Sequence, residues 1–319
     1  MRSTLIPSTT RARRAAAVTA LLGATVLATA ACNDEDGTAT PVSGAPATSV
    51  TATGAPGSAA QATVRTVGKT GWFEGFEITV DKATVAPDAY GGAKVLIDIT
   101  YKNTTLDNKT MSNNTSLLVG SEVDGGASWD NPTVPGNGSA KGTVTTPVKS
   151  AKEAERLLDT MTVVYGQAAD NQTKIPLAAA GQVESVAPKT LPVTGTLVQD
   201  QTTIEVTGGK LAPSYARNEH GKYELALRIR ISGGPGIAAG GTNIFTEYFS
   251  VRTPDGQTVV ADDRGQINEL LDAGKTIDNP KNYVVFVVPA PATGEYVLSY
   301  SNQKAEAATT APTLAFTVH

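Results

Sequence analysis

Residues 225–231 read LALRIRI, a stretch in which aliphatic side chains alternate with others along its whole length. Because successive side chains of a β-strand point to opposite faces, this period of two places the leucines and isoleucines on one face and the arginines on the other. A strand with one buried and one solvated face is typical of antiparallel sheets. Similar short runs recur along the chain with Gly, Pro, Asn or Asp between them, which predicts β-sandwiches.

The same pattern occurs earlier in the chain. One copy holds ITV at 78–80, VAPD at 85–88 and VLIDITY at 95–101; the other holds IEV at 204–206, LAPS at 211–214 and LALRIRI at 225–231. Pro213 follows Pro87 by 126 positions, whereas Leu225 follows Val95 by 130, so the second hairpin is expected to be four residues longer, near 218–221. The repetition predicts two tandem antiparallel β-sandwiches, one over residues 62–187 and another over 188–319.

Local patterns predict several further elements. Residues 161–165 and 296–300 are expected to be late strands, and each ends in tyrosine. Residues 151–160 and 266–273 are the two stretches with helical character, and each is long enough for a short helix only. The sequence Gly208-Gly209-Lys210 has neither the spacing of a phosphate-binding loop nor a following helix, so a turn is expected there.

The N-terminus has the features of an export signal. The first fourteen residues contain four arginines and no acidic residue, and residues 15–31 then run without a charge and end in the small residues ATAA. A basic start, a short apolar core and a small-residue cleavage site predict a secretory signal peptide over residues 1–31. An uncleaved anchor helix is the alternative, although the run is short and rich in alanine for a membrane span.

Cys32 is the only cysteine of the chain, so it has no disulfide partner within the chain. Its surroundings resemble a bacterial lipobox, in which the cysteine after two small residues is lipidated, although Thr29 stands where leucine is usual. The resemblance implies a protein anchored to the membrane through the lipid on Cys32, at the extracellular face, and a second acyl chain would make that attachment stable. Residues 32–61 therefore combine the lipidated cysteine with a disordered linker rich in Ala, Thr, Gly, Ser and Pro.

The composition argues against several classes of partner. Residues 1–31 hold four of the 26 Lys and Arg and none of the 30 Asp and Glu, so the rest of the chain carries a net charge of 22 − 30 = −8. An acidic surface argues against nucleic acid as a partner. Two histidines and one cysteine leave too few ligands for a zinc, copper or haem site, so no metal and no cofactor is predicted.

The sequence contains no clear catalytic pattern. The two histidines are His220, in the expected second hairpin, and His319, and neither has the packed partner that a Ser-His-Asp triad needs. Carboxylate pairs that could serve a glycosidase are Glu74 with Glu77 and Asp262 with Asp263. Acidic residues this close in a strand or loop are more typical of a solvated surface. We therefore expect a protein that is not an enzyme.

Loop carboxylates of the second repeat offer calcium as an alternative ligand, because calcium prefers oxygen ligands. These residues are Asp255, Asp262, Asp263, Asp272 and Asp278. Their spacing does not match an EF-hand loop.

Trp72 and Trp129 are the candidate contact residues. Trp72 precedes the first strong strand, and Trp129 lies in the loop-like stretch 125–138. Exposed tryptophans are frequent anchors of binding sites. Packing against the core, or within an ordinary loop, is the alternative for both side chains.

The layout resembles that of actinobacterial secreted proteins and lipoproteins with DUF4352-type domains, which have a telokin-like immunoglobulin fold. The resemblance rests on FEITV at 76–80, the strand 95–101 with Lys102-Asn103, VRTPDG at 251–256, Gly274-Lys275, Val285-Phe286, and Pro289 through GEYVL at 294–298. These motifs spread over much of residues 62–319. The resemblance implies immunoglobulin-like sandwiches outside the cell, and it implies no activity and no site residues.

These observations predict a lipid-anchored, non-enzymatic binding or interaction module whose partner is an envelope protein or polymer. The alternative is a surface protein that binds a small ligand or calcium in a cleft between the two sandwiches, and an extracellular hydrolase comes third. A cleft lined by Trp72 or Trp129 with converging polar groups would favour the small ligand. A large exposed apolar patch would favour a protein partner.

Overall fold

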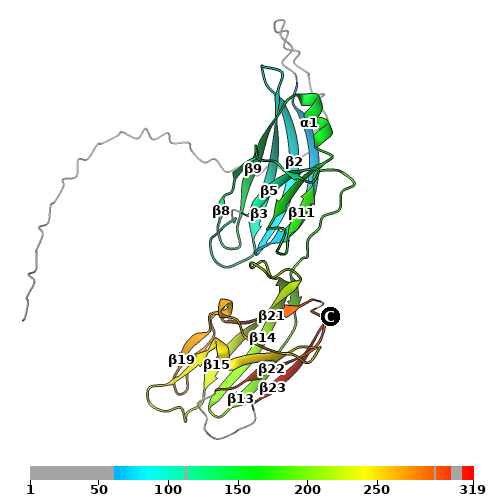
Figure 1. The fold of residues 1–319 in the computed structure, drawn as a ribbon. Coiled ribbons are helices and arrows are strands. Elements are labelled where there is room, and N and C mark those ends of the chain that lie inside the picture. Colours follow the sequence, from blue (N-terminus) through cyan, green and yellow to red (C-terminus); the bar gives the residue numbers. More distant parts are fainter. Residues whose placement is uncertain (1–60, 112–113, 291, 303–310) are drawn as a thin grey trace, which may run out of the picture. The chain divides into compact units, whose positions relative to one another are not determined.

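The computed structural model describes residues 61–111, 114–290, 292–302 and 311–319, which are built mainly from antiparallel β-strands (Figure 1). The predicted signal peptide, Cys32 and nearly all of the predicted linker lie outside these residues. The described part contains one α-helix, α1 (Ala151–Leu157), and two 3₁₀ helices, η1 (Thr246–Tyr248) and η2 (Asp263–Gly265). The predicted all-β sandwich class is confirmed.

Residues 63–176 form two larger sheets and a short ribbon, which we call the first sandwich. One sheet has the order β1-β2-β3-β9-β7, with strands Thr63–Phe73, Phe76–Pro87, Ala93–Asn103, Ser139–Val148 and Ser128–Asp130. The other has the order β11-β10-β5-β6, with strands Thr173–Pro176, Met161–Tyr165, Thr115–Val119 and Glu122–Val123. The ribbon pairs β4 (Lys109–Thr110) with β8 (Thr133–Val134).

Residues 189–318 form the second sandwich. Its larger sheet contains β12 (Lys189–Leu191), β13 (Gly195–Gln199), β14 (Thr202–Pro213), β15 (Lys222–Gly233), β20 (Thr276–Ile277) and β21 (Tyr283–Pro289). Its other main sheet has the order β18-β17-β22-β23, with strands Thr258–Val260, Phe249–Arg252, Gly294–Tyr300 and Thr313–Val318. A ribbon pairs β16 (Thr242–Phe245) with β19 (Asn268–Leu271).

The strand order repeats from one sandwich to the other. In the larger sheets, β2, β3 and β9 correspond to β14, β15 and β21, and the edge strand β1 corresponds to the two short strands β12 and β13. In the other main sheets, the order β11-β10-β5-β6 corresponds to β23-β22-β17-β18. The pairing register repeats as well, because Val80 faces Ile99 in the first sandwich and Val206 faces Ile229 in the second. These pairs preserve the offsets of 126 and 130 positions, so the structure supports the predicted duplication.

Both copies also carry a register shift at the same place. The pairing of β2 with β3 shifts between Val80 and Lys82, and that of β14 with β15 shifts between Val206 and Gly208. An extra residue of this kind bends a strand and increases its twist. The segment Gly208-Gly209-Lys210 is therefore the continuation of a bulged strand, and the expectation of a turn there is wrong.

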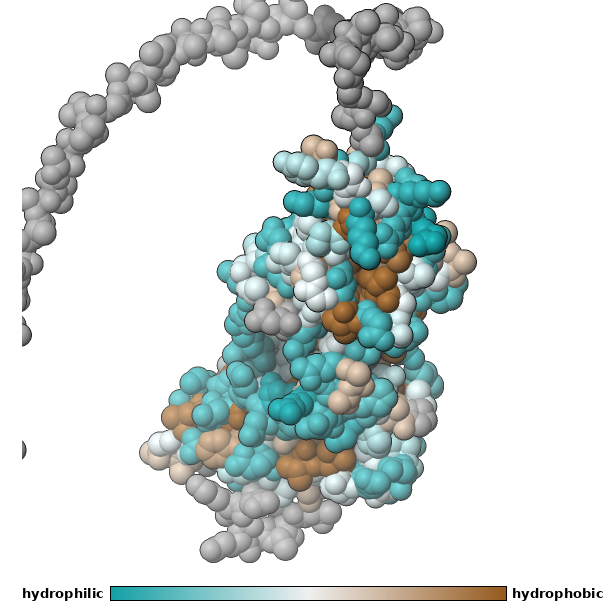
Figure 2. Space-filling model, turned by 45° about the horizontal axis from the view of Figure 1, so that its top comes forward, coloured by the Kyte–Doolittle hydropathy of each residue, from teal (hydrophilic) through white to brown (hydrophobic). Residues whose placement is uncertain are grey.

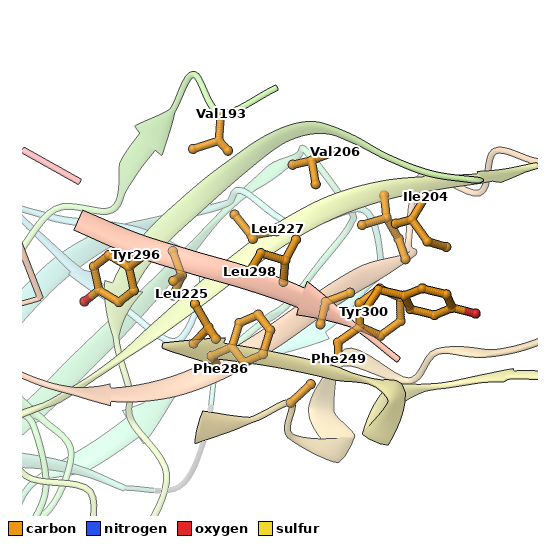
Figure 3. Close-up of a cluster of buried hydrophobic side chains, with 14 of the residues drawn as sticks. Val193, Ile204, Val206, Leu225, Leu227, Phe249, Phe286, Tyr296, Leu298 and Tyr300 are labelled. Carbon is orange, nitrogen blue, oxygen red and sulfur yellow. The ribbon is translucent and has the colours of Figure 1, made fainter. Parts of the chain in front are cut away.

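Each sandwich encloses its own cluster of buried apolar side chains. The first cluster draws on both sheets of the first sandwich and includes the large side chains of Tyr101 and Tyr165. In the second cluster, aliphatic side chains of β14 and β15 pack against aromatic side chains of β17, β21 and β22 (Figure 3). Burial of one such aliphatic or aromatic side chain contributes about 1.5–3 kcal/mol.

The alternation of residues 225–231 is realised as predicted. All four aliphatic side chains of this stretch are 0% exposed. Arg228 and Arg230 point to the other face, where Arg228 pairs with Asp278 at 2.8 Å and Arg230 pairs with Glu205. The cross-strand ion pairs keep the charged face of the sheet soluble while the opposite face fills the core.

One of the two predicted helices is present. Helix α1 begins after Ser150, whose hydroxyl caps the helix by accepting a hydrogen bond from the Glu153 amide. The prediction of a helix over 266–273 is wrong, because β19 occupies its middle, residues 268–271, and pairs with β16. Gln266 has a φ of 53°, a left-handed conformation that separates the short helix η2 from the strand.

The exposed apolar side chains are scattered over many elements. Figure 2 shows brown residues in separate areas among teal and white ones on the face drawn. The large apolar side chains that are most exposed belong to different strands and loops, for example Val64, Tyr90, Val123 and Val198. A single large apolar patch, the feature that would favour a protein partner, is not apparent on the face drawn.

A candidate ligand pocket lined by both sandwiches

A pocket with a volume of about 340 Å³ is lined by residues of both sandwiches. All the described residues belong to one compact unit. The volume of the pocket lies near the lower end of the range that is usual for small-molecule sites. Its lining residues are Trp72, Phe73, Glu74, Gly75, Thr105, Lys109, Pro188, Lys210, Ala212, Pro213, Tyr215, Ala216 and Glu224.

The first wall is the turn between β1 and β2. Glu74 and Gly75 have φ angles of 46° and 82°, the two positive values that define a tight I′ hairpin. Glycine suits such a position, whereas glutamate adopts it at a conformational cost. Strained backbone of this kind concentrates at functional sites. The Lys109 ammonium donates a hydrogen bond to the Glu74 carbonyl oxygen and thereby stabilises the turn.

The second wall is the hairpin between β14 and β15, which is the place of the predicted four-residue extension. Tyr215, in this hairpin, donates a hydrogen bond from its hydroxyl to the Trp72 carbonyl oxygen at 2.8 Å. Its ring lies with its centroid 4.5 Å from that of Phe73 and packs against the first cluster. The extended hairpin therefore closes one side of the pocket.

The same hairpin contacts the loop between β10 and β11. The side-chain amide of Asn171 donates hydrogen bonds to the carbonyl oxygens of Ser214 and Lys222, at 2.6 and 3.0 Å. The amide oxygen of Asn171 accepts one from the Gly221 backbone at 3.0 Å. Asp170 accepts another from the Asn218 backbone at 2.6 Å. We call this set of contacts, between residues 170–171 and 214–222, the joint.

An arginine supports the hairpin from within the second sandwich. Arg264 contacts both carboxylate oxygens of Glu219 at 3.1 Å, Glu224 at 2.7 Å and Asp262 at 2.8 Å. Burial raises the pKa of Glu219, but hydrogen bonds from Arg264 and Ser214 outweigh it, and the pKa is lowered overall. The ion pair with Arg264 also holds Glu224 at the edge of the pocket.

The remaining charged groups of the pocket are less well compensated. Among the described residues, no carboxylate lies within 4.0 Å of the ammonium of Lys109 or Lys210. Burial lowers the pKa of Lys210, with Glu224 acting in the opposite direction. Burial raises the pKa of Glu74, with Lys109 acting in the opposite direction.

The two predicted contact residues occupy different surroundings. Trp72 lies in β1 and lines the pocket. Trp129 lies in β7, where it pairs with Val144 and packs against the first cluster, and its ring meets that of Tyr165 edge-on at 6.2 Å. The stretch around Trp129 is therefore partly strand and not only loop. Of the two residues, Trp72 is the one that lines the pocket.

The candidate catalytic residues are dispersed. His220 lies in the extended hairpin with its Nδ1 atom 3.1 Å from the Asp170 carbonyl oxygen, and the His319 carbonyl oxygen accepts a hydrogen bond from Lys189. Glu74 lines the pocket, whereas Glu77 pairs with Lys102 at 3.0 Å. Asp262 accepts a hydrogen bond from the Arg264 backbone and caps η2.

Four of the five carboxylates considered for calcium have separate interactions, including Asp262 with Arg264 as described above. Asp255 bonds Thr253, Asp272 pairs with Lys275, and Asp278 pairs with Arg228. In the part of the chain that the structure describes, no group of three or more His, Cys, Asp or Glu side chains could hold a metal ion. The predicted calcium alternative thus finds no cluster in these residues.

Sequence reasoning did not identify Lys109, Lys210, Tyr215 and Glu224 as pocket residues. Lys109 lies in β4 and the other three lie in the β14–β15 hairpin, and Tyr215 is 143 positions from the Trp72 carbonyl that it bonds. One signal was present, since the difference between the two repeat offsets points directly to the extended hairpin. A longer loop in one copy of a repeat often marks its binding face.

Comparisons with known proteins add little. No family model and no curated protein matches the chain. A conserved hypothetical protein from Bacillus anthracis has 11% sequence identity and a TM-score of 0.26, over 36% of this chain and 96% of that one. A conserved domain protein from the same organism has 12% identity and a TM-score of 0.22, over 80% and 90% of the two chains. Within the described residues, no helix is long and apolar enough to span a membrane.

Proposed function

We propose that the chain is a lipid-anchored, extracellular protein that binds a small ligand without transforming it. The observation that carries the proposal is the pocket of about 340 Å³ lined by Trp72, with charged groups of both signs around it. Pockets that combine an apolar wall with a few polar groups are the usual sites of small ligands. The lipid on Cys32 and the extracellular location rest on the sequence, as does the resemblance to DUF4352-type proteins.

The pocket favours a small ligand over an envelope protein or polymer as the partner. A broad exposed apolar area would favour a protein partner, whereas the most exposed large apolar side chains belong to separate elements. The joint stabilises the pocket walls in the absence of ligand, so less ordering is required when the ligand binds.

The two tryptophans of the chain make the proposal testable by fluorescence. A fragment library is titrated into the mature chain and into its Trp72→Phe and Trp129→Phe variants. We expect at least one fragment to change the fluorescence of the wild type and of Trp129→Phe, and to leave Trp72→Phe unchanged. A change that depends on Trp129 alone, or no response to any fragment, would remove the support for this pocket.

A glycoside hydrolase is the second candidate, because Glu74 and Glu224 line the same pocket and burial raises the pKa of Glu74. Such enzymes use one protonated and one ionised carboxyl group. Chromogenic glycosides test this candidate. Turnover by the wild type that is lost in Glu74→Gln would replace the binding proposal with an enzymatic one.

A further inference from the structure

The ligand class follows from the charge distribution in the pocket. Four lining residues carry a charge, namely Lys109, Lys210, Glu74 and Glu224. Glu224 is already paired with Arg264 at 2.7 Å, which is itself outside the lining set. These two ammonium groups are matched by two carboxylates, and Arg264 divides its contacts among Glu224, Glu219 and Asp262.

This local balance of charge contrasts with the rest of the molecule. The chain after residue 31 carries a net charge of −8. In the described residues, several lysines and arginines pair with a carboxylate on a strand of the same sheet, as Lys102 does with Glu77. Lys109 and Lys210 are instead partly buried at a shared cavity without a carboxylate within 4.0 Å. Lys109 donates a hydrogen bond to the Glu74 carbonyl oxygen, and a partly desolvated ammonium group that lacks an ion pair attracts an anion.

The uncharged lining residues define the rest of the ligand. Trp72 and Tyr215 contribute aromatic surface, and Pro188, Ala212 and Pro213 contribute aliphatic surface. Aromatic side chains favour flat or ring-shaped ligand groups, which they contact over a large area. The volume restricts the ligand to a small molecule.

We propose that the pocket binds a small organic acid, with its carboxylate on the ammonium groups of Lys210 and Lys109 and its apolar ring against Trp72. This inference rests on the proposed function, since it specifies the ligand of the same pocket. Glu74 limits the ligand to one negative charge on this side of the pocket, because the Glu74 carboxylate would repel a second anionic group.

Three probes with the same ring separate charge from shape. Phenylacetate, phenylacetamide and phenethylamine are titrated into the mature chain by calorimetry, at low and at high salt. We expect phenylacetate to bind about tenfold more tightly than either of the others, and to weaken as salt is raised. A preference for phenethylamine or equal binding of all three would overturn the organic-acid proposal.

Variants of Lys210 test where the carboxylate of phenylacetate binds. Lys210→Gln is expected to weaken phenylacetate about tenfold, and Lys210→Arg, which keeps the charge, to retain most of the affinity. Lys94→Gln is the matched control, because Lys94 is an exposed lysine on β3 that does not line the pocket. Unchanged affinity in Lys210→Gln would overturn the assignment of the carboxylate.

The outcomes also separate this inference from the proposed function. If a neutral or cationic probe binds in a Trp72-dependent way and phenylacetate does not, the ligand class is wrong and the pocket is still a binding site. If neither the three probes nor the fragment library produces a Trp72-dependent signal, both proposals fail.

Discussion

Individual tyrosines make the stability of this protein sensitive to alkali. The hydroxyls of Tyr101 and Tyr165 lie 3.0 Å apart in the first cluster, and burial raises the pKa of Tyr101 to about 12. In the second sandwich, burial raises the pKa of Tyr300 to about 12. Both side chains are thus kept neutral well above the ordinary tyrosine value of 10.0.

The first prediction concerns this pH range. A group with a raised pKa contributes its full stability below its ordinary value and loses that contribution as the pH rises through the folded value. We expect the free energy of unfolding to fall from about pH 10 towards pH 12, as measured by urea titrations at each pH. Tyr165→Phe should make this fall less steep, and Tyr90→Phe, at an exposed position, should not. Complete ionisation of the buried tyrosines in folded protein would contradict the explanation.

At the scale of elements, the buried and exposed faces of one strand pair can be compared directly. Val206 on β14 is 1% exposed and belongs to the second cluster, whereas Val198 on β13 is 58% exposed. We expect Val206→Ala to cost about 2 kcal/mol, because it removes buried methyl groups and leaves a cavity. Val198→Ala should change stability by less than about 0.5 kcal/mol. Urea unfolding measures the change in the free energy of unfolding for each variant. Equal changes would mean that Val206 and Val198 do not differ in burial as the structure has it.

The joint is the second feature at this scale. The Gly221 amide donates a hydrogen bond to the Asn171 side chain at 3.0 Å, so its exchange with solvent should be slow. We predict that Asn171→Ala accelerates amide exchange across residues 218–222 and leaves the core strands protected. Asn108→Ala, at an exposed position in another loop, is the control. Unaltered exchange in Asn171→Ala would show that the joint does not order the hairpin.

The elements also show what local sequence pattern can reveal. Alternation predicted the strand through 225–231 because one face is fully buried and the other is charged. The same criterion missed β1, whose sequence TVRTVGKTGWF has two glycines and a register shift between Thr66 and Lys69. It also assigned helix to β19, because the four residues NELL are too few to display a period of two. Pairing with β16 determines that strand, and the partner is distant in sequence.

For the whole molecule, the pocket could not be predicted, because its walls meet only after both sandwiches have folded. The composition of the chain could still be used to argue against some functions, since two histidines and one cysteine are few ligands for a metal site. Repetition was the strongest large-scale signal, since two offsets in the sequence predicted both the tandem arrangement and the site of the longer hairpin.

The membrane anchor is tested at the same scale. We expect Cys32→Ser to move the protein from the membrane fraction to the medium or to a soluble fraction, because the lipid on Cys32 is the proposed attachment. Fractionation followed by immunodetection measures this, and Ser43→Ala in the linker is the control. If Cys32→Ser stayed in the membrane as completely as the wild type, the anchor would have to be sought elsewhere.

The longer hairpin of the second repeat also bears on the ancestry of the protein. The walls of the pocket come from both copies, and Tyr215 belongs to a loop that is shorter in the first copy. An ancestor with a single copy would have lacked half of the lining residues, and one with two identical copies would have lacked the extension that closes the pocket. We infer that the pocket is younger than the fold, because its walls need a difference between the two copies.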